Sequence, residues 1–250
     1  MGSRKSCSDC GHNECLAEYV DHDYCFSCHK TSFLDTKRTI VSRPKKVFEG
    51  VPEEACCELP SAAWAYLWQY GITQEAAAKR DLRYIDFIEI DGVKLRNRLL
   101  IPGIVGGECQ YVLLRALTKG DVPKVYNWGN MQNLYYANTY NFTDYVVIVE
   151  DAISAIVVGE VNRCVALNGT SLSDSKLADL LQLGKKFIIW MDGDKPGKEA
   201  ARKIKNKLGM LAHKVVRVES PLDPKCYSRE QIEKFLRRSW SSRQEEVFKI

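Results

Sequence analysis

The chain has 250 residues, of which 45% are hydrophobic and 27% are charged, a composition typical of a globular protein with a sizeable core. No apolar run approaches the roughly 20 residues that cross a bilayer, and the N-terminal sequence MGSRKSCSDC lacks the apolar segment of a secretory signal. These features exclude a membrane-spanning protein and predict a reducing, cytoplasmic location. The ten cysteines are therefore interpreted as metal ligands or buried thiols rather than disulfides.

The net charge of +4 is unevenly distributed along the chain. Residues 195–250 carry 15 Lys and Arg against 7 Asp and Glu. Such an asymmetry indicates a polyanionic partner.

Residues 1–35 are rich in cysteine, and two Cys-x2-Cys pairs, CSDC and CFSC, are separated by 14 residues. Each pair presents two thiolates from one tight turn, and two pairs complete a tetrahedral zinc site. A redox pair is a weaker interpretation, since nothing thioredoxin-like follows either motif. The predicted ligands of one structural zinc ion are Cys7, Cys10, Cys25 and Cys28. Nearby side chains that could replace one of them are His12, Cys15, His22 and His29.

Residues 36–56 are mixed in composition and lack periodicity, which predicts a linker. Within this segment KRTIVSRPKK carries five Lys and Arg and no acid. That stretch suits a tether over nucleic acid, although a solvated connector explains it equally well.

Residues 57–144 mix helical and strand patterns. Apolar residues spaced i, i+3, i+4 after Pro60 predict a helix that stops at Gly71, and TQEAAAKRD predicts a second helix from Thr73. Residues 84–118 are expected to form strands, with hairpin turns at the Asp-Gly pair 91–92 and the Gly-Gly pair 106–107.

From residue 145 onward, short apolar strands alternate with helical segments. The strands are VVIVE, CVALN, FIIWMD and KVVRVE, and the helices are AISAIVVG, SDSKLADLLQL and PGKEAARKIKNKL. This alternation predicts a parallel α/β sheet.

Acidic residues follow three of these strands. In a parallel sheet all strands end at one edge, where sites form, so these side chains are expected to gather there: Glu150, Asp192, Asp194 and Asp223. A strand-end turn explains any one of them, but the combination indicates a hard cation such as Mg²⁺, with Mn²⁺ as a substitute. Glu150 is positioned to act as an acid/base or as a further ligand.

The stretch GDKPGK after the third strand is not a phosphate-binding P-loop, because it is one residue short and lacks the following Ser or Thr. A helicase-type ATPase is therefore excluded.

The motifs VIVED, WMDGDKPG and SPLDPK resemble the three motifs of the Toprim fold. The preceding ELPSAAWAYLWQYGIT and the basic hairpin QYVLLRALTKGDVPKVYNWG resemble the N-terminal subdomain of phage primase catalytic cores. With the cysteine module in front, nearly the whole chain resembles the primase half of phage primase–helicases. The resemblance implies a zinc ribbon at 1–35, a linker at 36–56, an N-terminal α+β subdomain at 57–144 and a Toprim α/β domain at 145–250.

The same resemblance implies a DNA primase, a nucleotidyltransferase that makes short RNA primers on single-stranded DNA from ribonucleoside triphosphates. A replicative helicase or DNA polymerase is an expected partner, in the host cytoplasm if the gene is phage-encoded. The four strand-end acids would hold Mg²⁺ and the triphosphate, and the zinc module would read the template. The residues assigned to nucleotide or DNA contacts are Arg115, Lys119, Lys124, Lys195, Lys198 and His22.

Two departures from the family pattern stand out. Asp151 replaces the glycine that usually follows the first acid, and Ser154 replaces an aspartate, so an altered metal preference is expected. Two rival classes share these motifs: a recombination mediator that only binds DNA, and a Toprim nuclease. The mediators have a helix-hairpin-helix before the cysteines, whereas only six residues precede Cys7 here, and a nuclease does not need the basic subdomain.

Overall fold

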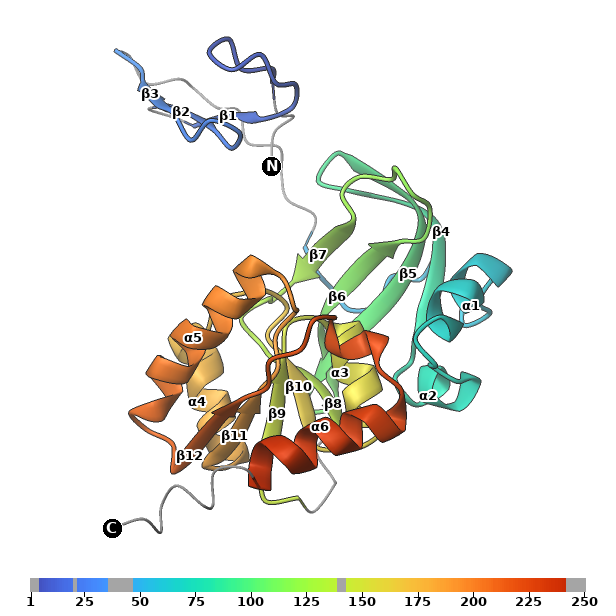
Figure 1. Ribbon diagram of the computed structural model, residues 1–250. Helices are drawn as coiled ribbons and strands as arrows, with labels where there is room; N and C mark the ends of the chain where they lie inside the picture. The colour runs from blue at the N-terminus through green and yellow to red at the C-terminus, as the bar shows by residue number, and fades with distance from the viewer. Residues whose placement is uncertain (1–4, 20–21, 36–46, 139–142, 242–250) are drawn as a thin grey trace. The chain divides into compact units, whose positions relative to one another are not determined.

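The computed structural model describes residues 5–19, 22–35, 47–138 and 143–241 (Figure 1). The chain separates into two units, Met1–Lys46 and Val47–Ile250. The basic tether KRTIVSRPKK lies outside the described residues.

The N-terminal unit is a three-stranded antiparallel sheet in the order β1-β2-β3. Its strands are β1 (Leu16–Glu18), β2 (His22–Cys25) and β3 (Thr31–Phe33). The buried interior of this unit consists of Cys7, Cys15 and Cys25. Three thiols provide little apolar surface to stabilise a sheet, which is typical of small units that fold around a metal ion.

The second unit begins with two short helices and a four-stranded antiparallel sheet. The helices are α1 (Ser61–Trp68) and α2 (Gln74–Lys79), and Thr73 caps α2 by accepting a hydrogen bond from the Ala76 backbone N–H. The strands, paired in sequence order, are β4 (Arg83–Ile90), β5 (Val93–Val105), β6 (Glu108–Ala116) and β7 (Val125–Gly129). Both predicted hairpin turns are present, and Asp91 and Gly92 have positive φ angles as a tight primed turn requires.

The segment before α1 packs on this sheet. Ala55 is buried, and Phe48 and Val51 pack against the same apolar cluster. Cys56 pairs with Tyr84 as an isolated β-bridge. The packed part of the second unit thus begins within the segment that the sequence patterns predict as a linker.

The second sheet has five strands in the order β12-β11-β9-β10-β8. The predicted parallel strands are present as β9 (Val146–Val149), β10 (Cys164–Ala166), β11 (Lys186–Ile189) and β12 (Lys214–Arg217). The edge strand β8 (Tyr135–Asn138) runs antiparallel to β10 and has no counterpart among the predicted elements.

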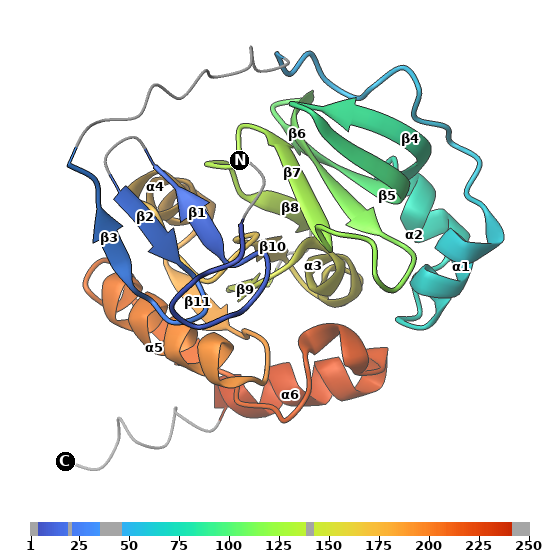
Figure 2. The same ribbon diagram turned by 90° about the horizontal axis from the view of Figure 1, so that it is seen from above.

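Helices cover both faces of this sheet (Figure 2). Helices α4 (Asp174–Leu183) and α5 (Lys195–Gly209) pack on one face. Helices α3 (Ala152–Gly159) and α6 (Arg229–Ser241) pack on the other, in a cluster that also includes residues of α1, α2, β5 and β6. A short 3-10 turn, η1 (Pro224–Cys226), precedes α6. The predicted α/β architecture is therefore confirmed.

None of the helices in the described part of the chain combines the length and the apolar character that crossing a membrane requires.

Candidate zinc site and acidic site

The four predicted cysteines converge in the N-terminal unit. Their sulfur atoms all lie within 4.8 Å of one another, with Cys7 Sγ 4.0 Å from Cys28 Sγ and Cys10 Sγ 3.7 Å from Cys25 Sγ. Zinc–sulfur bonds of about 2.3 Å in a tetrahedron place sulfurs roughly 3.8 Å apart. The four cysteines therefore fit a zinc ion.

Two of these thiols, Cys10 and Cys25, have lowered pKa values, which favours their thiolate forms. The backbone N–H groups of Cys28 and Ser27 donate to Cys25 Sγ, each at 3.4 Å, and lower the pKa of Cys25 against the effect of burial. Hydrogen bonds from His12 lower the pKa of Cys10 to about 7. Thiolates are the form that binds zinc.

Cys15 lies beside the cluster without joining it. Its burial raises the pKa of its thiol to about 11, and its sulfur lies 3.5 Å from Cys25 Sγ. Among the described residues, none of the alternative ligands (His12, Cys15, His22 and His29) belongs to the four-atom group.

His22 lies on β2, between two aromatic side chains of the N-terminal unit. Its ring stacks on Tyr19, with centroids 4.5 Å apart and an interplanar angle of 11°, and it contacts Phe33 at 5.7 Å. Tyr19 and Phe33 are exposed, so this face of the N-terminal unit presents flat rings to solvent.

The second site is at the carboxyl edge of the five-stranded sheet. β10, the next strand along the chain after β9, lies on one side of β9 in the sheet. The following strand, β11, lies on the other side of β9. This is a topological switch point, where ligands bind in open α/β sheets. Glu150 follows β9 and Asp192 follows β11, on neighbouring strands.

Glu150 and Asp192 each carry a buried oxygen without a hydrogen-bond partner in the structure, Glu150 Oε2 and Asp192 Oδ1. Burial, reinforced by neighbouring carboxylates, raises the pKa of Glu150 and brings the pKa of Asp192 to about 7. Buried, unpaired carboxylate oxygens are costly unless a cation or proton compensates them. Each of these two carboxylates is therefore suited to a cation.

Lys225 lies among the neighbouring acids, and sequence reasoning did not assign it a role. Its Nζ is 2.9 Å from Asp151 Oδ2, 2.9 Å from Asp223 Oδ2 and 3.7 Å from Asp192 Oδ2. Burial alone would lower the pKa of this ammonium group, but the three carboxylates outweigh burial and raise it. The one hint in the sequence is the lysine of SPLDPK, directly after the proline that begins η1.

The two departures from the family pattern contact each other. Asp151 is the N-cap of α3, and its Oδ1 accepts from the backbone N–H groups of Ile153 and Ser154 at 2.9 and 3.0 Å. Its Oδ2 accepts from Ser154 Oγ at 2.8 Å. Burial would raise the pKa of Asp151, but Lys225 and these hydrogen bonds lower it.

The predicted acids share one edge of the sheet but do not form a tight cage. Asp194 is exposed and caps α5 by accepting from the Gly197 backbone N–H at 2.8 Å. Within the described ranges, only the four cysteines form a group of three or more candidate ligands within 4.8 Å. Of the four predicted acids, Glu150 and Asp192 are the two with a buried oxygen that has no hydrogen-bond partner in the described part of the chain.

The basic hairpin borders this edge. Arg115 on β6 lines a cavity of about 180 Å³ together with Glu150, Asp151 and Asn168. Its guanidinium carbon lies 5.2 Å from the centre of the Tyr66 ring, which fixes the side chain over α1. The other two predicted hairpin residues, Lys119 and Lys124, are exposed and do not line this cavity.

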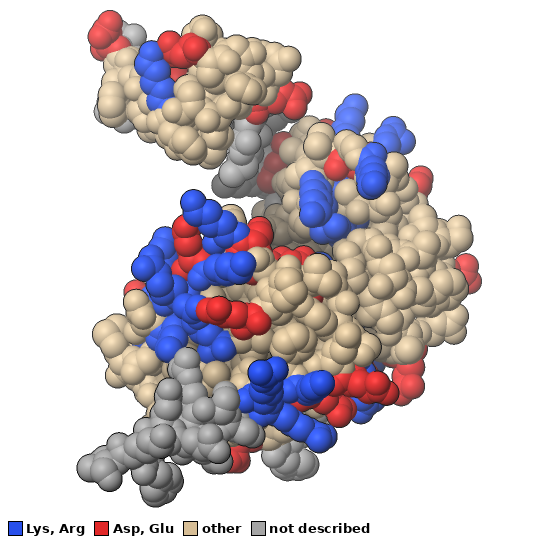
Figure 3. Space-filling view, in the orientation of Figure 1, with Lys and Arg blue, Asp and Glu red and all other residues tan. Residues whose placement is uncertain are grey.

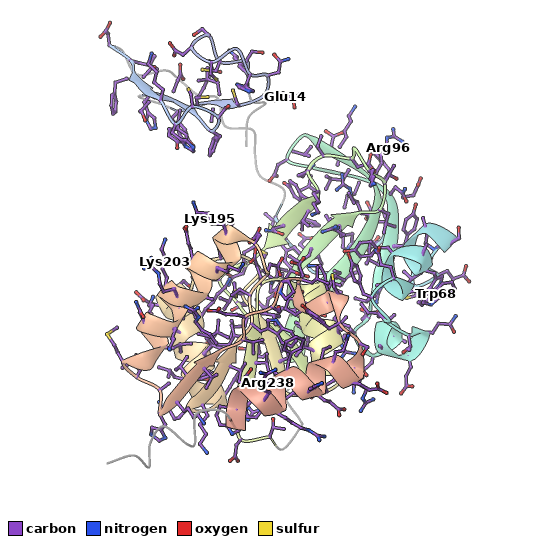
Figure 4. The ribbon with its side chains drawn as sticks, in the orientation of Figure 1. Glu14, Trp68, Arg96, Lys195, Lys203 and Arg238 are labelled. Carbon is purple, nitrogen blue, oxygen red and sulfur yellow. The ribbon has the colours of Figure 1, made fainter. Side chains whose placement is uncertain are left out.

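Basic side chains also gather along α5 on one face of the second unit (Figure 3). Lys195 and Lys203 project outward from this helix (Figure 4), and Lys198 is exposed one turn from the Asp194 cap. These side chains form a positively charged surface beside the carboxyl edge of the sheet.

Comparison with known proteins agrees with this architecture. Residues 147–227 match a family model described as Toprim-like. A DNA primase of Lactococcus lactis subsp. lactis (strain IL1403) is 38% identical over 79 residues, which is 32% of this chain and 12% of that protein. The match therefore spans only a small part of the length of this relative.

Solved structures with a similar fold include several primases. The Aquifex aeolicus primase, with its zinc-binding and RNA polymerase domains, has a TM-score of 0.60 and 22% identity over 72% of this chain and 56% of its own. The primase fragment of the bacteriophage T7 primase-helicase protein has a TM-score of 0.53 and 16% identity over 95% of this chain and 98% of its own. Residues 147–227 are thus Toprim-like, and the chain shares the fold of primase catalytic cores with a four-cysteine module in front, so the predicted resemblance is confirmed.

Proposed function

We propose that this chain is a DNA primase, which synthesises short RNA primers on single-stranded DNA. The observation that carries the proposal is the switch point of the Toprim-like domain, where Glu150, which lines the Arg115 cavity, and Asp192 on the neighbouring strand each carry a buried oxygen without a hydrogen-bond partner. Replication proteins and a host cytoplasmic location are parts of the same proposal.

In this proposal Glu150 and Asp192 hold one Mg²⁺, which when bound would neutralise charge on a nucleoside triphosphate. Arg115 faces the same cavity and would bind a phosphate or the template backbone, since a guanidinium pairs well with phosphate oxygens. The stacking of Arg115 on Tyr66 limits its rotation, which reduces the entropy lost on binding. Asp194 and Asp223 border the site, and Asp194 orients the start of α5.

The exposed lysines would act at longer range. Lys119 and Lys124 on the hairpin, with Lys195 and Lys198 on α5, would attract the template backbone by displacing its counterions. In the N-terminal unit the aromatic face around His22 would stack on template bases, because rings bind unpaired bases of any sequence. The four-cysteine zinc site would keep this face folded.

The test is primer synthesis from labelled ribonucleotides on single-stranded DNA with Mg²⁺. We expect Asp192→Asn to reduce synthesis by at least about 100-fold, the scale typical of losing one group that stabilises developing charge, with little change in DNA affinity. The matched control is Asp144→Asn, since Asp144 is exposed and its carboxylate pairs with Lys186 at the opposite end of β11 from Asp192. Degraded DNA would indicate a nuclease instead, and binding without synthesis would indicate a mediator.

A further inference from the structure

The loop between β6 and β7, residues 117–124, carries two of the lysines assigned to DNA contacts, Lys119 and Lys124. Both are exposed, and Val122 between them is 75% exposed. Arg115 and Val125 pair with each other at the base of the loop, and both line the cavity of about 180 Å³. The loop therefore extends from the wall of this cavity.

Arg98 on β5 holds the second half of the loop. Its Nη1 donates to Pro123 O, and its Nη2 donates to Val122 O at 3.4 Å. The residue is 1% exposed, and burial lowers the pKa of its guanidinium. A buried cation is unfavourable unless hydrogen bonds compensate it, so packing alone does not explain an arginine at this position.

Asn97, the preceding residue, holds the first half of the loop. Its Nδ2 donates to Thr118 Oγ1 at 2.6 Å, and its backbone oxygen accepts from the Leu117 N–H at 3.2 Å. The Tyr84 hydroxyl donates to Asn97 Oδ1 at 3.1 Å, which orients the amide. Two consecutive residues of one strand thus fix both halves of the loop.

We infer that Arg98 is a positioning residue for nucleic-acid binding, because it orders the loop that carries Lys119 and Lys124 before phosphates bind. The Pro123 carbonyl that Arg98 holds directly precedes Lys124. The Lys124 carbonyl accepts from the Ala116 N–H at 3.0 Å, so the backbone at this lysine is held on both sides. An ordered loop loses less entropy on binding than a mobile one. The inference rests on the proposed function, since it concerns the template strand that primer synthesis would use.

The test is a double-mutant cycle on the affinity for single-stranded DNA, measured with the zinc-loaded full chain and a fluorescent oligonucleotide. In the natural protein, Lys119→Ala and Lys124→Ala together should weaken binding at least about 10-fold, because two phosphate contacts are lost. Arg98→Met alone should weaken binding roughly 10-fold, the scale expected when two lysine side chains must be ordered on binding. In the Arg98→Met protein the two lysine changes should weaken binding by less than about 3-fold, since the residues act through the same loop.

The matched control is Arg83→Met, which removes an arginine from β4 that pairs with Asp81 at 3.0 Å. In this protein the two lysine changes should keep their full effect. Equal lysine effects in the Arg98→Met and Arg83→Met proteins would overturn the inference. Lysine changes without effect on binding by the natural protein would overturn it as well.

Amide hydrogen exchange separates the order of the loop from general stability. The Ala116 N–H closes the loop at Lys124, whereas the Trp190 N–H donates to Ile148 O in the other sheet at 2.8 Å. Arg98→Met should speed the exchange of the Ala116 amide at least about 10-fold more than that of the Trp190 amide. Equal acceleration of both amides, or none at Ala116, would show that Arg98 does not act on the loop.

If Arg98→Met does not fold, Arg98→Lys takes its place. An ammonium group lacks the planar fork that reaches two carbonyls, so smaller changes in the same direction are expected in both measurements. Primer synthesis is measured separately. Its absence, together with coupling between Arg98 and the two lysines, would remove the proposed function but leave the inference.

Discussion

Gly193, between the two aspartates of KFIIWMDGD, is expected to be intolerant of any side chain. A Cβ atom at this position would lie 2.6 Å from Pro221 O, 2.8 Å from Pro221 C and 2.8 Å from Ser220 O. All three atoms belong to the backbone, so no side chain can rotate away, and the loop after β12 must move by several tenths of an ångström. Overpacking of this kind typically costs about 1–3 kcal/mol.

The movement would also disturb a buried hydrogen bond. Trp190 Nε1 donates to Ser220 Oγ at 2.8 Å, and Ser220 Oγ donates to Leu222 O at 2.7 Å. Lengthening one such bond adds about 1 kcal/mol. For Gly193→Ala we therefore expect the free energy of unfolding to fall by about 2–4 kcal/mol.

Urea unfolding followed by tryptophan fluorescence measures this change. All five tryptophans lie in the second unit, so the signal does not report on the cysteine module. The control is Gly209→Ala, because a Cβ at Gly209 meets nothing within 4 Å and alanine favours a helix by up to about 1 kcal/mol over glycine. Equal stability of Gly193→Ala and Gly209→Ala would refute the reasoning.

Two further predictions concern the metal and the nucleic acid. We expect Cys25→Ser to lose bound zinc, measured by elemental analysis, and to unfold the N-terminal unit, seen as lost NMR dispersion of residues 5–35. The tryptophan unfolding curve should stay unchanged. Retained zinc would contradict the four-cysteine assignment. We expect the affinity of the protein for single-stranded DNA to fall with added salt. Arg115→Ala and Lys119→Ala should each reduce the slope of log K against log salt by about 1. A flat titration of the natural protein would exclude a phosphate-binding surface.

Much of the fold follows from local patterns that the sequence displays directly. Each β-α repeat carries its own periodicity, and turn residues such as Asp91 and Gly92 require specific backbone angles. The cysteine spacing is equally local, because each pair occupies one turn. These features could be predicted because a few neighbouring residues determine them.

The remaining features depend on contacts between distant segments. Strand β8 is short, and only its pairing with β10 identifies it as part of the second sheet. Lys225 belongs to a three-residue turn, and its importance arises from acids that follow other strands. No short window of sequence contains both Lys225 and the acids after the other strands, so the ammonium group among these carboxylates could not be predicted.

The attachment of β8 to the five-stranded sheet has a consequence for cooperativity. This strand follows the four-stranded sheet in the chain, and one apolar cluster joins Leu99 and Tyr111 of that sheet to Val147 and Ile188 of the other. A chain cut at residue 144 would remove β8 and expose the side of β10 that pairs with it, while β9 would still pair with the other side. The cut would also separate the residues of the first sheet from the rest of the shared apolar cluster. We therefore expect the two sheets of the second unit to unfold together rather than one at a time.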